Sequence, residues 1–288
     1  MRTVDSAHGS TLDPRPPTLE MTTETEQDGT VTLTVNNGIA TVTFFHPKRN
    51  ALPAHILRKL ADAIDTAGSH PDARIIILAS EGTGAFCAGA SFDELRGLKT
   101  ADEGKEFFSG FARVILAMRR NPRIIIGRIQ GKAVGGGVGL VAATDYSFAL
   151  DGASIRLSEL AVGLGPFVVG PVIERKIGRA AFAGLSIDAD WRDCSWAEQH
   201  GLYTRVMDTE PALDAVLPAF ANRLVSQNPE ALTQLKRVLW EGTNHWETLL
   251  FERAAISGKL AMSEYTKRAI EQSARSTHPT PIPGRPGY

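Results

Sequence analysis

Cysteine is scarce in this chain of 288 residues, which contains only Cys87 and Cys194. Two cysteines so far apart match neither a disulfide scaffold nor the paired spacing of a zinc site. The seven histidines are scattered and include no H-x-x-x-H pair. We therefore expect two buried thiols, no metal site and a reducing compartment, the cytoplasm.

Net charge and long apolar runs are also lacking. Lys and Arg number 31 against 32 for Asp and Glu, a formal charge of −1. This balance gives no net field that would attract nucleic acid or an acidic membrane surface. No apolar run approaches the ~18 residues that span a bilayer, and the N-terminus lacks the basic and hydrophobic regions of a signal peptide. Neither nucleic acid nor membrane is expected as a partner.

Large apolar residues are nearly absent from residues 1–29, and residues 276–288 hold four prolines without periodicity. Such segments cannot bury enough surface to offset the entropy of ordering, so we expect two flexible tails. Between them we expect an α/β core at residues 30–208 and a helical region at residues 209–275.

The core alternates strand and helix patterns. β-Forming residues flank Asn36-Asn37-Gly38, the signal for a tight hairpin. Apolar side chains recur at helical spacing before and after short β-branched runs. The expected strands are residues 30–35, 39–45, 74–79 and 124–126 with another near 146, and the expected helices are residues 53–69 and 101–120. This βαβ rhythm predicts a mostly parallel sheet with crossover helices.

Strand patterns become rare after Asp151, and helical patterns dominate towards the C-terminus. We expect short strands at residues 155–157 and 202–207, and helices at residues 173–177, 196–200, 211–227, 230–241 and 246–272. A helical block of this length is expected to dock on the core or on a neighbouring subunit.

A glycine cluster, GKAVGGGVGL at residues 131–140, stands between two apolar segments. Glycine has no Cβ and reaches positive φ at little cost, so several backbone N–H groups can point at one oxygen. A helix starting there would add unpaired N–H groups and its dipole. A second loop, Ala88-Gly89-Ala90, also follows a strand. Together the two loops predict a site that polarises a carbonyl group.

Two other readings of the glycines stay open. Gly135, Gly136 and Gly137 are also compatible with tight packing of a helix on a strand. Residues 137–142 formally match the G-x-G-x-x-A dinucleotide fingerprint, with Glu159 about 20 residues further on. Because the glycines follow a Gly131-Lys132 turn rather than a strand directly, a nicotinamide-dependent oxidoreductase is the weaker reading.

Glu159 stands out among the carboxylates because it lies in the otherwise apolar stretch LSELAVGL. Apolar surroundings raise the pKa of a carboxyl group towards neutrality, which suits an acid/base catalyst. The alternative is a helix whose one polar residue faces water. Asp93 and Glu94 are expected to favour a helix start. No G-x-S-x-G elbow is present, which argues against an ordinary serine hydrolase.

These motifs resemble the crotonase, or enoyl-CoA hydratase/isomerase, superfamily over residues 30–268. The similarity is carried by PKRNAL at 47–52, AFCAGASFDEL at 85–95, the glycine cluster, ATDY at 143–146, LSEL at 157–160 and AEQHGL at 197–202. The resemblance implies a crotonase-like α/β fold, a spiral of ββα units in stacked sheets with C-terminal helices that drive trimerisation. It also implies a homotrimer or a dimer of trimers.

The resemblance further implies the site residues. The backbone N–H groups of Ala90 and Gly136 would stabilise the thioester oxygen as it becomes an enolate, with Glu159 as acid/base. The rest of the acyl-CoA substrate would lie along residues that the family motifs place at the site: Lys48, Arg49, Ala51, Ala88, Ser91, Phe92, Asp93, Gly135 and Gly139. Coenzyme A is then part of the substrate, and no separate cofactor is expected.

The chain departs from the best-known hydratases at Gly139, where they carry a first glutamate. A single glutamate is enough to move a double bond, whereas hydration usually divides its proton transfers between two carboxylates. A glycine there with a Leu-Ser-Glu segment also resembles the methylglutaconyl-CoA hydratase subgroup. The sequence thus favours a hydratase slightly, with a Δ3-Δ2 isomerase or a silent acyl-CoA-binding scaffold as alternatives. The usual PGAGGT is replaced by PFVVGP at 166–171.

Overall fold

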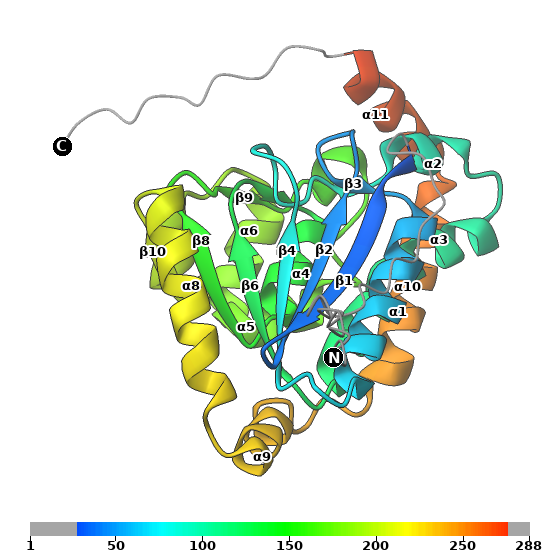
Figure 1. The fold of residues 1–288 in the computed structure, drawn as a ribbon. Coiled ribbons are helices and arrows are strands. Elements are labelled where there is room, and N and C mark those ends of the chain that lie inside the picture. The colour runs from blue at the N-terminus through cyan, green and yellow to red at the C-terminus, as the bar shows by residue number, and fades with distance from the viewer. Residues whose placement is uncertain (1–27, 276–288) are drawn as a thin grey trace, which may run out of the picture.

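The computed structural model describes residues 28–275 (Figure 1), so nearly all of both predicted tails lies outside the described residues. A six-stranded sheet forms the centre, in the order β1-β2-β4-β6-β8-β10. Its strands are β1 (Thr30–Asn36), β2 (Ile39–Phe45), β4 (Ile75–Ser80), β6 (Ile124–Ile129), β8 (Tyr146–Leu150) and β10 (Arg205–Met207). The mostly parallel sheet predicted from the sequence is confirmed, with β1 and β2 as its one antiparallel pair.

The β1–β2 hairpin turns at Asn37 and Gly38, which have φ values of 51° and 82°. Positive φ at both central residues gives a turn whose twist matches the flanking strands, and Asn-Gly is the pair that adopts it most readily. The hairpin supplies the sheet edge, and β2 then pairs in parallel with β4.

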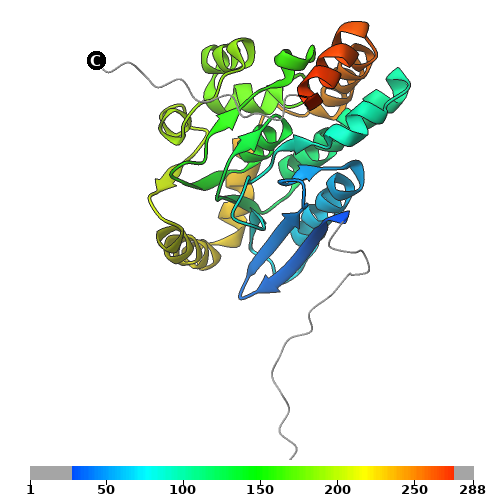
Figure 2. The ribbon, with the colours of Figure 1, turned by 90° about the horizontal axis from the view of Figure 1, so that it is seen from above.

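Helices cover both faces of this sheet, as two perpendicular views show (Figures 1 and 2). On one face lie α1 (Ala54–Ser69), α3 (Ala101–Arg120) and α10 (Trp246–Ala261), the last packed along α3. On the other face α8 (Glu210–Val225) places Leu213, Leu217 and Ala221 against the isoleucines of β4 and β6. β4 is consequently buried along its whole length.

Short elements at the carboxyl ends of the strands carry the loops of interest. β3 (Ala51–Leu52) pairs with β5 (Gly89–Ala90), and β7 (Ala133–Val134) pairs with β9 (Ile155–Arg156). A bridge from Cys87 to Ala133 links the two small sheets. Helices or helical turns follow all four strands: α1 follows β3, and the others are α2 (Phe92–Gly97), α4 (Gly136–Ala143) and the 3-10 helix η2 (Glu159–Val162).

Two parts of the C-terminal half differ from the sequence-based expectation. The helix α6 (Arg179–Asp188) was not predicted, because its apolar residues form no clear stripe and only Leu185 is buried. The single helix expected at 246–272 is wrong: α10 ends before Met262 and α11 (Glu264–Arg275) begins anew. Ser263 causes the break, since its hydroxyl caps α11 by accepting from the Thr266 N–H at 3.2 Å.

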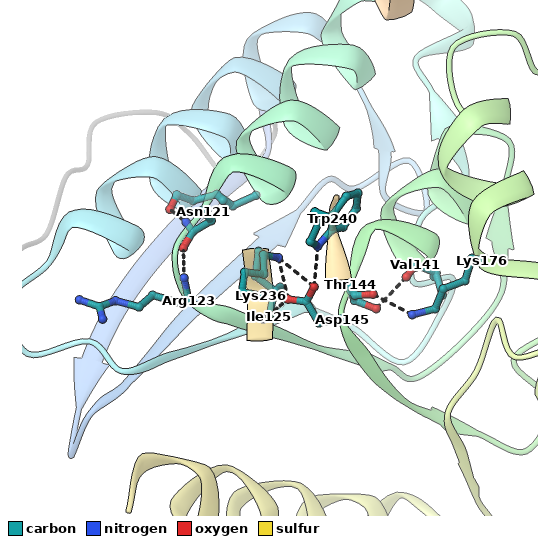
Figure 3. Close-up of polar contacts among 10 residues, drawn as sticks. Asn121, Arg123, Ile125, Val141, Thr144, Asp145, Lys176, Lys236 and Trp240 are labelled. Carbon is teal, nitrogen blue, oxygen red and sulfur yellow. Dashed lines mark hydrogen bonds and ion pairs between the residues drawn. The ribbon is translucent and has the colours of Figure 1, made fainter. Parts of the chain in front are cut away.

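The remaining helices are α5 (Gly170–Ile177), α7 (Cys194–Gln199) and α9 (Pro229–Leu239). A buried ion pair anchors α9 (Figure 3): Lys236 Nζ donates to both Asp145 carboxylate oxygens, at 2.9 and 2.7 Å. Trp240 Nε1 and the Ile125 backbone N–H donate to the same carboxylate, each at 2.8 Å. Across residues 28–275 no helix has the length and apolar character needed to cross a membrane.

Candidate active site

The two glycine-containing loops meet at the carboxyl end of the sheet. The Val134 N–H donates to the Cys87 carbonyl at 2.9 Å, and the Cys87 N–H donates to the Lys132 carbonyl at 3.3 Å. Gly89 has φ of 94°, and a Cβ built on it would lie 3.8 Å from the Gly136 nitrogen. The backbone of β5 therefore lies directly beside the start of α4.

The start of α4 presents unpaired backbone donors. Gly135 has φ of 53° and ψ of −118°, and its N–H is held by the Arg156 carbonyl at 2.9 Å. This conformation turns the chain so that the helix begins at Gly136. The first N–H groups of an α-helix have no partner within the helix, and the dipole there favours negative charge. Gly136 and Ala90 line the same cavity, which is the arrangement that a carbonyl-polarising pair of donors needs.

Close packing explains why Gly136 and Gly137 have no side chain. A Cβ on Gly136 would lie 2.3 Å from Cζ of Phe111, and one on Gly137 would lie 2.4 Å from the Cys87 carbonyl oxygen. The packing interpretation thus applies to Gly136 and Gly137, and Gly136 also lines the cavity. Both interpretations of the glycines are compatible with this arrangement.

Glu159 brings its carboxyl group to this loop. A Cβ on Gly135 would lie 3.1 Å from Glu159 Oε1, so the carboxyl group rests against the residue before the helix. Oε2 is buried and has no hydrogen-bond partner among the described residues. Burial raises the pKa of this carboxyl group to about 7, opposed in part by a hydrogen bond from its own backbone N–H. The group is therefore poised to gain or lose a proton near neutral pH.

The cavity that holds Glu159 has a volume of about 110 Å³ and mostly apolar walls. Five phenylalanines contribute to it: Phe92, Phe107, Phe108, Phe111 and Phe167. Glu159 is the one titratable side chain among the described residues that line it. Any proton transferred inside the cavity by a side-chain carboxyl group must therefore pass through Glu159.

The space beside Gly139 is filled by an apolar side chain. A Cβ on Gly139 would lie 2.5 Å from Cγ1 of Val169 and 3.6 Å from Cδ1 of Ile115. Val169 is buried and belongs to the cavity wall. Gly139 leaves room for the side chain of Val169, which stands where the usual family segment PGAGGT has a glycine. The two departures from the family pattern therefore fit each other.

Neither Asp93 nor Glu94 takes the place of a carboxylate at position 139. The exposed Asp93 pairs with Lys48 at the surface, and that hydrogen bond lowers the pKa of Asp93. Glu94 Oε2 accepts from the Ala54 N–H at 2.9 Å, which satisfies a donor at the start of α1. Both carboxylates lie outside the lining of the cavity.

The other expected substrate-binding residues gather near the same opening. Ala51 pairs with Gly89 in the small β3–β5 sheet, and Lys48 and Arg49 are exposed in the loop before it. Ala88 and the partly exposed Phe92 line the cavity. Ser91 instead caps α2, where its hydroxyl accepts from the Glu94 N–H at 3.3 Å. Ser91 is therefore the N-cap residue of α2.

Some residues of the site gave no clear signal in the sequence. Phe111 lies 25 positions before Gly136, against which its ring packs, and periodicity marked it only as a core residue. Phe167 and Val169 lie in the PFVVGP segment. The sequence showed that this segment departs from the family pattern, but it did not show that these two side chains line the cavity. The Arg156 carbonyl that holds Gly135 carries no side-chain signature at all.

The dinucleotide interpretation is not supported by this geometry. Its fingerprint requires glycines that let a pyrophosphate approach the backbone closely. Here Gly137 and Gly139 are closed off by Cys87 and Val169, and Glu159 is directed at Gly135. Among residues 28–275 no group of three or more His, Cys, Asp or Glu side chains is placed to hold a metal ion.

Known proteins of one family share this architecture. The enoyl-CoA hydratase/isomerase family model matches residues 34–271. A probable enoyl-CoA hydratase of Bacillus subtilis is 27% identical over 84% of this chain and 94% of its own length. The mitochondrial methylglutaconyl-CoA hydratase of Mus musculus is 30% identical over 76% of this chain and 68% of its own. The crystal structure of an enoyl-CoA hydratase from Bacillus halodurans, 20% identical, superposes with a TM-score of 0.78 over 84% of this chain and 99% of its own. The chain belongs to the enoyl-CoA hydratase/isomerase family.

Proposed function

We propose that this protein adds water to an α,β-unsaturated acyl-CoA thioester, with Glu159 carrying both proton transfers. One observation carries the proposal: a buried carboxyl group with a pKa of about 7 rests against Gly135, next to the N–H of Gly136. The names of the related hydratases support addition of water over other reactions of the family.

In this proposal the thioester oxygen accepts hydrogen bonds from the N–H groups of Ala90 and Gly136. Negative charge grows on that oxygen as a nucleophile attacks the β-carbon, and fixed backbone donors stabilise it without reorganising. Losing one such donor typically costs about 10²- to 10³-fold in rate. Lys48 and Arg49 lie exposed at the same edge, Lys48 in its surface pair with Asp93, and we assign both to the phosphates of coenzyme A.

A single carboxyl group suffices for the proton balance. Water forms a bond to the β-carbon and loses a proton to one oxygen of Glu159, while the other oxygen delivers its proton to the α-carbon. The glutamic acid is regenerated, and both new bonds form on the face of the substrate that Glu159 occupies. This cycle requires Glu159 to start protonated, which a pKa of about 7 permits at neutral pH.

A second function, the shift of a double bond from the β,γ to the α,β position, is favoured by the filling of the space beside Gly139 with Val169. That reaction needs one base to remove a proton from the α-carbon and return it to the γ-carbon. It requires Glu159 to start as a carboxylate. The two functions therefore make opposite demands on the protonation of the same group.

The pH dependence of kcat/KM distinguishes them. Hydration of crotonyl-CoA by protonated Glu159 should slow as the pH rises through about 7, whereas isomerisation of a 3-enoyl-CoA should slow as the pH falls through about 7. Hydration with the first profile supports the proposal. Isomerisation alone would replace it with the second function, and tight thioester binding without turnover of either substrate would indicate a scaffold.

We further infer a homotrimer or a dimer of trimers, as the family resemblance implies. The helix α9 supports assembly because Leu235, Val238 and Leu239 are all exposed on it, at spacings of three and four residues. Apolar stripes of this kind are common where a helix meets a partner.

A further inference from the structure

The cavity beside Glu159 has aromatic walls held rigidly in place. Phe107 and Phe108 are in edge-to-face contact, with ring centroids 5.0 Å apart. The ring of Phe111 stands against Gly136, where no larger residue would fit. Because these rings are supported by one another and by the backbone, they define a fixed space for a ligand rather than an adaptable one.

Phe167 adds a bulky group to the same space. Its N–H donates to the Gly165 carbonyl at 2.7 Å, and its Cζ lies 2.4 Å from where a Cβ on Gly165 would stand. The ring is thus folded tightly over its own turn. Val168 and Val169, the next two residues, are buried beside it. This wall narrows the cavity with three large side chains in succession.

The resulting volume suits a small group. The cavity has a volume of about 110 Å³. It lies below the roughly 300–1,000 Å³ of sites for drug-sized ligands. A short acyl chain is enough to fill a space of this size, whereas a chain of eight carbons would have to displace a wall or extend out of the cavity.

The charge of the cavity also limits its ligand. No Lys, Arg or His is among the described residues that line it, and Glu159 is itself acidic. A second carboxylate on the acyl group would enter without a counter-charge and would face Glu159. A charge buried without a partner is strongly disfavoured.

We infer that this site selects short, uncharged acyl groups and that Phe167 is the residue that limits their length. The inference rests on the proposed function and names its substrate class. It separates this protein from relatives that act on a branched acyl group bearing its own carboxylate, because the cavity offers that carboxylate no partner.

Steady-state kinetics with three thioesters test the inference. Wild-type kcat/KM for crotonyl-CoA should exceed that for 2-octenoyl-CoA by about tenfold or more, and that for 3-methylglutaconyl-CoA by about 10²-fold. Phe167→Ala should shift the crotonyl-to-octenoyl ratio towards the longer chain by at least about tenfold. Phe251→Ala removes the same side chain from a partly buried position on α10 that does not line the cavity, and it should leave that ratio unchanged. Equal wild-type use of either larger substrate, or an unchanged ratio in Phe167→Ala, would overturn the inference.

Binding measurements keep the inference separate from the proposed function. Calorimetry with butyryl-CoA, octanoyl-CoA and glutaryl-CoA reports the cavity without any chemistry. Butyryl-CoA should bind most tightly to the wild type, and Phe167→Leu, a milder change, should already narrow its advantage over octanoyl-CoA. Loss of turnover with this order of affinity intact would reject only the proposed function, whereas tightest binding of glutaryl-CoA would reject the inference itself.

Discussion

Glu159 links the chemistry of this protein to its stability. The pKa of its carboxyl group is about 7 in the folded protein against an ordinary value of 4.5. The folded state therefore binds the proton more tightly than the unfolded state does. The protonated carboxyl group of Glu159 therefore contributes to the free energy of unfolding. This contribution is fully present below about pH 4.5 and is lost as the pH rises through about 7, because the apolar cavity must then hold a negative charge.

Replacing this residue should consequently stabilise the protein at high pH. We predict that the difference in unfolding free energy between Glu159→Gln and the wild type grows in favour of the variant by roughly 2–3 kcal/mol from pH 5 to pH 8. Urea unfolding at the two pH values measures it. A difference that does not change with pH would show that the carboxyl group is not strained by burial.

At the scale of single residues, the sequence predicted Glu159 as a candidate because its neighbours are apolar. It did not predict where the carboxyl group lies, since that depends on η2 folding back towards Gly135. Lys236 shows the opposite case. A lysine on an amphipathic helix is expected to face water. Lys236 is nevertheless only 2% exposed, because its ammonium group pairs with Asp145, which lies 91 positions earlier in the sequence.

The buried ion pair anchors α9 to the core (Figure 3). We predict that Lys236→Met destabilises the protein by about 3–5 kcal/mol, because it leaves the Asp145 carboxylate buried without its counter-charge. Arg120→Met, which removes a half-exposed pair with Asp65 between α3 and α1, should cost under about 1 kcal/mol. Similar losses for the two variants in urea unfolding would contradict this account.

The contact between α4 and the PFVVGP segment offers a second test at this scale. Gly139→Glu alone should misfold or lose activity, since even its Cβ would stand 2.5 Å from Val169. Adding Val169→Gly removes the obstacle. The double variant should regain a wild-type circular dichroism spectrum and hydrate crotonyl-CoA at least about tenfold faster than Gly139→Glu. If both variants behave alike, Val169 is not what closes this position.

Helices and strands with clear periodicity were predicted well, and α3 was predicted with its observed bounds. Of the four two-residue strands only β9 was predicted, as part of a strand at 155–157, because so short a strand carries no periodic signal. The helix at Gly136 was raised as a possibility on its glycines alone. α6 was missed for lack of an apolar stripe, and the α10–α11 break depends on one capping serine.

For the whole molecule, the exposed apolar stripe on α9 predicts assembly. Sedimentation velocity of the wild type should give a trimer or hexamer, and the double substitution Val238→Glu with Leu239→Glu should shift it towards monomer, because two charges would be buried in the interface. The matched double substitution Thr233→Glu with Arg237→Glu, at polar positions on another side of the same helix, should leave the assembly intact. A monomeric wild type would contradict the prediction.

The fold as a whole was recognisable from motifs in the correct order, since loops that build a shared backbone site retain their glycines. Which reaction the site performs was less predictable, because it depends on what fills the space beside Gly139. That space is set by Val169, which is thirty residues away in the chain and belongs to a different loop.

The central claim is that one carboxyl group, beside two backbone donors, performs the proton transfers. Turnover of crotonyl-CoA by Glu159→Gln tests it most directly, with butyryl-CoA affinity measured alongside. The amide keeps the shape of the side chain but cannot exchange protons, so kcat should fall by about 10²-fold or more while the Kd for butyryl-CoA stays within about threefold. Unchanged turnover by this variant would contradict the claim.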